Sequence, residues 1–177
     1  MTRGRMDLSK PIVGKCEVAC ETLCLGQADA LDRVQGGMKW LWRKRCSHAE
    51  LRFKPHWEVE ATVRLRLFAH EQQVQVNAIV DGLTGIARCR RPGQTPELEL
   101  RTVDADRRVI PAIDEATALE AARKVIGRMA RRRRGVLDRL ETPVLFYKPV
   151  WLVAETIGGA PRYVVDGHTG LLARALP

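Results

Sequence analysis

Two short motifs each occur twice in this chain, in the same order, and they constrain the fold more than any other feature. The first reads Phe-Lys-Pro-His-Trp-Glu-Val over residues 53–59 and Tyr-Lys-Pro-Val-Trp-Leu-Val over 147–153. The second reads Val-Asp-Gly-Leu-Thr-Gly over 80–85 and Val-Asp-Gly-His-Thr-Gly over 165–170. Separate motifs that recur in one order indicate an internal repeat. The sequence therefore predicts a duplication whose copies differ mainly in the loop between the two motifs.

The residues around each motif have the pattern of antiparallel strands. Over residues 57–67 apolar side chains alternate with polar ones, which is typical of a strand with one buried face. Residues 74–80 form the next expected strand, which runs into the turn. There Asp81 is expected to accept hydrogen bonds from the turn amides, and Gly85 to adopt a left-handed conformation. Residues 144–154 are apolar on both faces, so we expect that strand to lie centrally or between the copies.

A helix is predicted before each copy. The clearer one starts after Pro111, with Asp114 as its N-cap and apolar residues at helical spacing on one stripe. Residues 31–41 show the same spacing more weakly, because two adjacent glycines interrupt it. A helix followed by a meander, twice, predicts an α+β fold of two tandem helix-plus-antiparallel-meander units. The expected organisation is an N-terminal helical segment (1–50), a first β-meander repeat with its connecting segment (51–110), and a helix with the second β-meander repeat (111–177).

The second half of the chain resembles the PepSY-like family. The resemblance rests on Ile113-Asp-Glu-Ala-Thr-Ala-Leu-Glu-Ala-Ala and, downstream, on Tyr163-Val-Val-Asp-Gly-His-Thr-Gly-Leu-Leu. In that family an Ala-rich helix packs on a small sheet that ends in a strand, Asp-x-x-Thr-Gly and a further strand. The resemblance covers residues 111–175 well and 51–90 in part, as tandem copies. It implies inhibition or ligand binding, in a family that is mostly extracytoplasmic and often found beside proteases or in membrane proteins.

Positive charge is concentrated at one place in the sequence. The 177 residues include 30 Lys and Arg against 21 Asp and Glu, a net charge of +9, and four consecutive arginines occupy 131–134. Successive helical residues are turned by about 100°, so four in a row cannot share one face. We therefore expect the helix to project beyond the body of the protein or to break near Gly135. Guanidinium groups bind phosphate bidentately, so the candidates for binding nucleic acid or another polyanion are Arg128, Arg131, Arg132, Arg133 and Arg134.

The N-terminal cysteines are the candidates for a metal site. Cys16, Cys20 and Cys24 are spaced by four residues, which would place three thiols along one face of a helix. Cys46 or His48 could supply a fourth ligand. Zinc sites more often use two-residue gaps, so a buried helix face is the other interpretation. No cofactor is predicted, and the five cysteines are expected to be reduced thiols.

No set of residues predicts catalysis. Asp166 and His168 resemble an acid–base pair, but the first copy has Asp81 and Leu83 at the same places, so turn chemistry explains the aspartate. Neither serine lies in a nucleophile elbow, and there is no phosphate-binding glycine loop. We therefore expect a protein that is not an enzyme and has no catalytic residues.

The function expected first is binding or regulation through recognition of a protein or peptide. The open face of the sheet or an edge strand is the expected place, with the candidates Trp57, Glu58, Glu60, Arg64, Arg66 and Trp151. A nucleic acid or other polyanion is the alternative, and a Cys-ligated metal protein is a further one; a homodimer is left open. No membrane span is expected, because no stretch approaches 18 apolar residues. The first residues lack an apolar run after their basic side chains, so we expect a cytoplasmic location.

Overall fold

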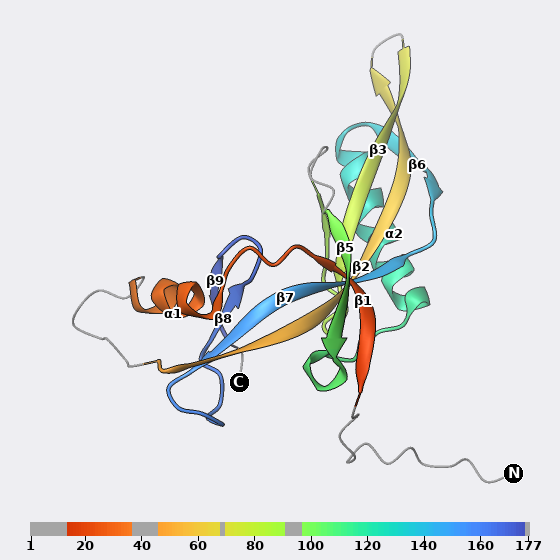
Figure 1. The fold of residues 1–177 in the computed structure, drawn as a ribbon. Helices are drawn as coiled ribbons and strands as arrows, with labels where there is room; N and C mark the ends of the chain where they lie inside the picture. Colours follow the sequence, from red (N-terminus) through yellow and green to blue (C-terminus); the bar gives the residue numbers. More distant parts are fainter. Residues whose placement is uncertain (1–13, 37–45, 68–69, 91–96, 176–177) are drawn as a thin grey trace, which may run out of the picture.

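The computed structural model describes residues 14–36, 46–67, 70–90 and 97–175, which form nine strands and two α-helices (Figure 1). A short 3-10 helix over Ala105–Arg107 follows the fifth strand. In chain order the elements are β1 (Lys15–Glu21), α1 (Gln27–Gly36), β2 (His48–Leu67), β3 (His70–Asp81), β4 (Ala87–Cys89), β5 (Leu98–Asp104), α2 (Glu115–Arg132), β6 (Gly135–Leu140), β7 (Val144–Ala154), β8 (Tyr163–Asp166) and β9 (Leu172–Arg174).

The strands join in one sheet that is organised around β2. The order is β4-β3-β2-β7-β1-β5, while β6 pairs with the C-terminal half of β2, and β8 links β7 to β9. The pairings are antiparallel except where Cys20 of β1 meets Tyr147 of β7, and at the isolated bridge between Phe53 and Arg108. With 20 residues, β2 is long enough to pair with β7 along its first half and with β3 and β6 along its second.

The two Lys-Pro motifs pair with each other at the centre of the sheet. Lys54 lies opposite Lys148, and the flanking pairs are Phe53 with Pro149 and Pro55 with Tyr147. β7 has β2 on one edge and β1 and β8 on the other. This confirms that the strand with two apolar faces is central. Residues of the two sequence repeats are therefore hydrogen-bonded neighbours.

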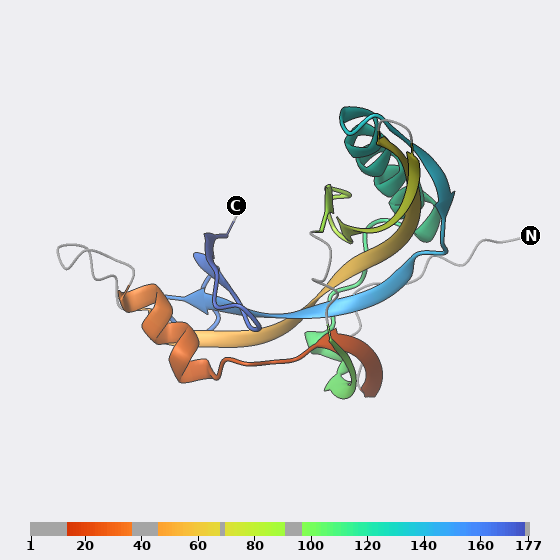
Figure 2. The ribbon, with the colours of Figure 1, turned by 90° about the horizontal axis from the view of Figure 1, so that it is seen from above.

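Each helix covers strands that come from both repeats or from the other one. α2 packs Ala118, Ala122, Ile126 and Ala130 against a cluster of buried apolar residues from β2 and β3. α1 packs Ala30 and Val34 against buried residues of β2, β7 and β8, among them Trp151. The two helices lie near opposite ends of the long β2–β7 pair (Figures 1 and 2). Both cover the face that holds the odd-numbered side chains of β2. We call the face with its even-numbered side chains the polar face.

The predicted fold class, an α+β fold of two tandem helix-plus-antiparallel-meander units, is wrong. The described chain is mostly strand, in one mixed sheet with two helices. The length of β2 is the physical reason, because a strand that serves both ends of the sheet cannot belong to one unit. The segments expected at 51–110 and 111–177 share that sheet, and within 1–50 the residues Lys15–Glu21 form a strand rather than a helix.

The ends of α2 follow the local rules. Asp114 is the N-cap, and its side chain accepts a hydrogen bond from the Thr117 amide, as expected. The helix ends at Arg132, and Arg134 has a positive φ of 56° before Gly135 enters β6. The expected break near Gly135 is therefore confirmed. Of the other predicted helix, 31–41, residues 37–41 lie outside the described part. No helix in the described ranges is long and apolar enough to cross a membrane.

Candidate functional site

The two Asp-Gly-x-Thr-Gly turns are built by the same hydrogen bonds. Asp81 Oδ1 accepts from the amides of Leu83 at 2.9 Å and Thr84 at 3.2 Å. Asp166 Oδ1 accepts from the amides at 168 and 169 at 2.9 and 2.8 Å. Gly85 and Gly170 close the turns with φ of 71° and 72°. This confirms the predicted roles of Asp81 and Gly85.

Each turn is tied to the Lys-Pro motif of its own repeat. The amide of Gly82 donates to the carbonyl of Pro55 at 2.9 Å, and the amide of Gly167 donates to that of Pro149 at 2.8 Å. Since the two Lys-Pro motifs pair with each other, these contacts bring both turns to the middle of the sheet.

A cluster of charged side chains lies where the motifs meet, and we call it the charged centre: Lys54, Lys148, Asp81, Glu21 and Arg90. The two lysines are cross-strand neighbours. Repulsion between two positive charges in this position is destabilising unless each has a partner of opposite charge. Each has a carboxylate partner, because Lys54 donates to Asp81 and Lys148 lies 3.3 Å from Glu21. Glu21 also pairs with Arg90 at 2.8 Å, although its side chain is only 4% exposed. The centre is thus a compensated, largely buried ion network.

Burial and neighbouring charge shift the protonation of this region. The pKa of His56 is lowered to about 3, first by burial and then by the ammonium groups of Lys148 and Lys54, against the opposing effect of Asp81 and Asp166. His56 stacks on Phe146, and its shielded Nδ1 has no hydrogen-bond partner in the described part. Burial alone would raise the pKa of Asp81, but hydrogen bonds from Lys54 and the Leu83 amide hold it below its ordinary value. His56 is therefore neutral at neutral pH.

Beside the charged centre the polar face is hollowed. A hollow of about 520 Å³ is lined by His56, Ile79, Asp81, Ile86, Arg88, Cys89, Arg90 and Lys148. Arg88 of the edge strand β4 is exposed, and no ion pair involves it within the described residues. The lining combines three cations and one carboxylate with two isoleucines. It therefore suits an anionic group that carries apolar atoms.

The structure does not bring the predicted protein-binding residues together. Trp57 and Trp151 lie on the face that the helices cover, and Trp151 donates from its indole to the Leu25 carbonyl at 3.0 Å. On the polar face Glu58 is buried, with a hydrogen bond from Asn77, and burial raises its pKa. Glu60 is exposed. Arg64 and Arg66 are exposed too, and they form ion pairs: Arg64 with Asp138 and Glu71, and Arg66 with Glu71.

The predicted polyanion-binding arginines are all exposed at the C-terminal end of α2: Arg128, Arg131, Arg132, Arg133 and Arg134. None of them forms an ion pair with an acidic residue in the described ranges. A second hollow, of about 420 Å³, runs over the outer side of α2, where Gly127 lies between Arg123, Lys124, Arg128 and Arg131. Glu120 also lines this hollow and pairs with Arg123 and Lys124, so the positive charge that has no acidic partner in the described ranges lies at Arg128 and Arg131.

The predicted metal ligands are dispersed. Cys16 and Cys20 lie in β1 and pack against the cluster around Phe53, whereas Cys46 is buried under α1. Cys24 is exposed in the loop before α1. In the described residues no three His, Cys, Asp or Glu side chains gather in a way that could hold a metal. The structure instead places Cys24 Sγ 3.5 Å from His168 Nδ1, a pair 144 residues apart that no sequence spacing signals.

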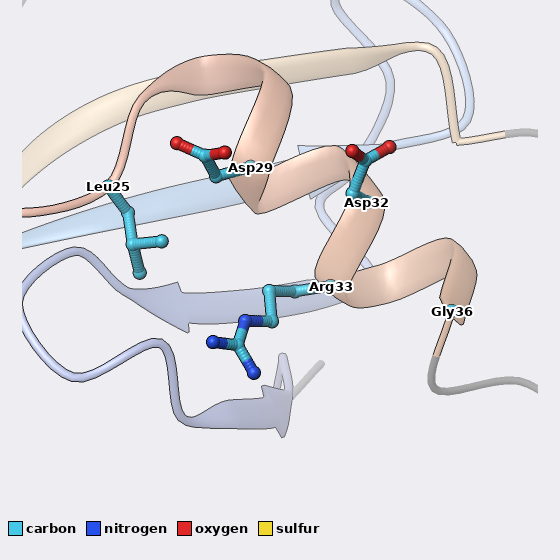
Figure 3. Close-up of a pocket in the computed structure, with 5 residues that line it drawn as sticks. All are labelled: Leu25, Asp29, Asp32, Arg33 and Gly36. Atoms are coloured by element: carbon cyan, nitrogen blue, oxygen red, sulfur yellow. The ribbon is translucent and has the colours of Figure 1, made fainter.

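A third hollow, of about 500 Å³, lies along α1 and is lined by Leu25, Asp29, Asp32, Arg33 and Gly36. Figure 3 shows the side chains of Leu25 and Arg33 pointing toward β8 and β9, whereas those of Asp29 and Asp32 point away from these strands. Asp29 accepts a hydrogen bond from the Gly26 amide at the start of α1, which is a structural role. These groups do not converge on one point, so we take the hollow beside the charged centre as the candidate site.

Comparison with family models, curated proteins and solved structures finds no match to this chain. The resemblance to the PepSY-like family stays a prediction.

Proposed function

We propose that this protein is a non-enzymatic binding module that recognises an acidic, partly apolar peptide segment of another protein on its polar face. The observation that carries the proposal is the hollow beside the charged centre, where Arg88, Arg90 and Lys148 stand around two isoleucines. Carboxylates would pair with the cations, and apolar side chains would cover Ile79 and Ile86. Binding-type function is also what the PepSY-like resemblance implies.

The edge position of β4 supports an extended ligand. β4 pairs only with β3 among the described strands, so its other edge offers backbone groups to an added strand. Arg88 lies opposite Ile79 on the polar face, beside that edge. A peptide that extends the sheet there would carry alternate side chains into the hollow.

The test measures binding of labelled peptides by fluorescence anisotropy. We expect a peptide of alternating Glu and Val to bind and one of alternating Lys and Val not to bind. Arg88→Glu should weaken binding at least about tenfold, as expected when a charge pair becomes a repulsion. Arg174→Glu, the same charge change on the exposed strand β9, is the matched control. Equal binding of both peptides, or equal losses in both variants, would overturn the proposal.

Polyanion binding through the end of α2 is a second candidate, supported by five exposed arginines that have no acidic partner among the described residues. Labelled single- and double-stranded nucleic acids, titrated with salt, form the test. Binding should weaken steeply with salt, and the slope should fall by roughly one for each phosphate-contacting arginine removed. The variant with Ala at 131–134 should lose binding, whereas replacing the exposed arginines 107, 139, 162 and 174 should not. Equal losses of binding in the two variants would show that binding depends on net charge and not on the arginines at 131–134.

A further inference from the structure

β5 is an edge strand without the lysine, proline or bulge that commonly protects such strands against pairing. It pairs with β1 over its whole length without a register shift, and no described strand meets its other edge. Edge strands usually carry lysine, proline or a bulge that prevents association. Its sequence, Leu-Glu-Leu-Arg-Thr-Val-Asp, contains no lysine and no proline.

The same strand exposes two large apolar side chains on one face. Leu100 is 80% exposed and Leu98 is 38% exposed. Residues two apart on a strand point to the same side of the sheet, so the two leucines form one apolar strip along the free edge. Val103, on the opposite face, is buried in the cluster that contains Phe53. The apolar strip is therefore exposed on one face of β5, while Val103 is buried on the opposite face.

We propose that β5 is the interface of a homodimer, in which two copies of the chain pair antiparallel about a two-fold axis at Leu100. This axis is perpendicular to the sheet, so equivalent faces of the two copies lie on the same side of the combined sheet. A residue must therefore face its own copy at the centre of the pair. With Leu100 at that centre, Leu100 faces Leu100, Glu99 faces Arg101 twice, and Leu98 faces Thr102.

The charges of β5 favour this register over its neighbours. A centre at Glu99 would set two carboxylates opposite each other, and a centre at Arg101 would set two guanidinium groups opposite each other, both of which are unfavourable. Within one chain Glu99 and Arg101 already lie 3.1 Å apart. In the dimer the four side chains would form a ring of alternating charge. The two apolar strips would cover each other on the other face.

The dimer rests on observations separate from the proposed peptide site, so either can fail alone. An interface of one strand pair is small, below about 1,200 Å² of buried surface, so we expect a dimer in the micromolar range or weaker. The test is sedimentation equilibrium of the full chain over a series from micromolar to millimolar concentration. The wild type should pass from monomer to dimer without larger species, because the two-fold contact is closed.

Charge reversal tests the register. Glu99→Arg and Arg101→Glu should each raise the dimer dissociation constant about tenfold, since each creates two like-charge pairs. The double variant should restore the wild-type constant, because its pairs are again opposite in charge. Leu100→Lys should abolish the dimer, whereas Ile157→Lys, at an 83% exposed position between β7 and β8, should not. Circular dichroism checks that each variant is folded. A wild type that stays monomeric, a dimer unaffected by Leu100→Lys, or a double variant without rescue would overturn the proposal.

Discussion

The two Asp-Gly-x-Thr-Gly turns have the same backbone hydrogen bonds and different surroundings. At the first turn Asp81 holds both the turn amides and Lys54 of its own repeat. At the second turn the side chain of Asp166 accepts hydrogen bonds from the amides at 168 and 169, and Lys148 pairs with Glu21 of β1 instead. The first turn borders the hollow with Ile86 and Arg88, whereas the second carries His168 beside Cys24.

The features shared by the two turns are those that the backbone conformation requires, and the features that differ belong to the surrounding site. The aspartate, the glycines and the contact with the Lys-Pro carbonyl recur because the backbone conformation requires them. The partner of each lysine differs because β1 approaches β7 on one side only. Functional differences between the repeats therefore arise from the strands that flank the turns, and the following variants test that conclusion.

Glu21→Gln should have the largest effect on stability. Lys148 and Arg90 would both lose a buried carboxylate, so we expect the free energy of unfolding to fall by about 3 kcal/mol. Urea denaturation at neutral pH measures it. The matched control is Glu17→Gln, an exposed glutamate of the same strand. A loss of stability no greater than in the control would mean that Lys148 does not need the carboxylate that β1 supplies.

Gly82→Ala and Gly167→Ala should destabilise the protein to a similar degree, by about 1–3 kcal/mol each. An added Cβ would lie 2.7 Å from the Pro55 carbonyl oxygen at the first site and 2.9 Å from that of Pro149 at the second. Gly36→Ala is the control, because a Cβ there meets nothing within 4 Å. Thermal and urea unfolding would both report the effect. If only one of the two variants were destabilised, the two turns would not contribute equally to the stability of the sheet.

His56 should make the protein lose stability in mild acid. Its pKa is about 3 in the folded chain against 6.5 in the unfolded chain, so its contribution is complete above pH 6.5 and is lost as the pH falls toward 3. Between pH 7 and pH 5 the expected loss is about 2 kcal/mol. Glu58, with a raised pKa, acts in the opposite direction, so the measurement compares the wild type with His56→Phe. His168→Gln, at the exposed histidine, should keep the wild-type pH dependence; an unchanged pH dependence in His56→Phe would contradict the assignment.

The smallest effect concerns Cys24, and it should appear in reactivity alone. Cys24 is exposed and next to His168, whereas burial raises the pKa of Cys20 and of Cys89. Iodoacetamide should therefore label Cys24 faster than these two thiols, as followed by mass spectrometry. His168→Leu, which installs the residue of the first turn, should slow that labelling severalfold without changing stability. Unchanged labelling would show that the histidine does not act on the thiol.

Local features could be predicted from the sequence because short-range rules decide them. The turn at Asp81, the N-cap at Asp114 and the end of α2 near Gly135 depend on residues within a few positions. The alternation along β2 also holds, with Val59, Ala61 and Val63 buried on one face.

The pairing of distant segments could not be predicted in the same way. Nothing near Lys54 signals that Lys148 lies opposite it, and the strand β1 was mistaken for a helix because its cysteines are spaced by four. His56 belongs to the polar face, yet Phe146 and the charged centre enclose it through contacts that no local pattern signals. The candidate site depends on such long-range contacts. The sequence therefore reveals the motifs beside the site but not which distant residues form it together.

The length of β2 bears on how the molecule can be divided. Because one continuous strand supplies hydrogen-bond partners to β7 at one end and to β3 and β6 at the other, both ends share a backbone support. A cut in the chain between β4 and β5 would divide both helix-covered clusters, because α2 packs on β2 and β3 of the first fragment, and α1 packs on β7 and β8 of the second as well as on its own β2. Such fragments would be folded only as a complex, which makes this protein a natural scaffold for complementation between split halves.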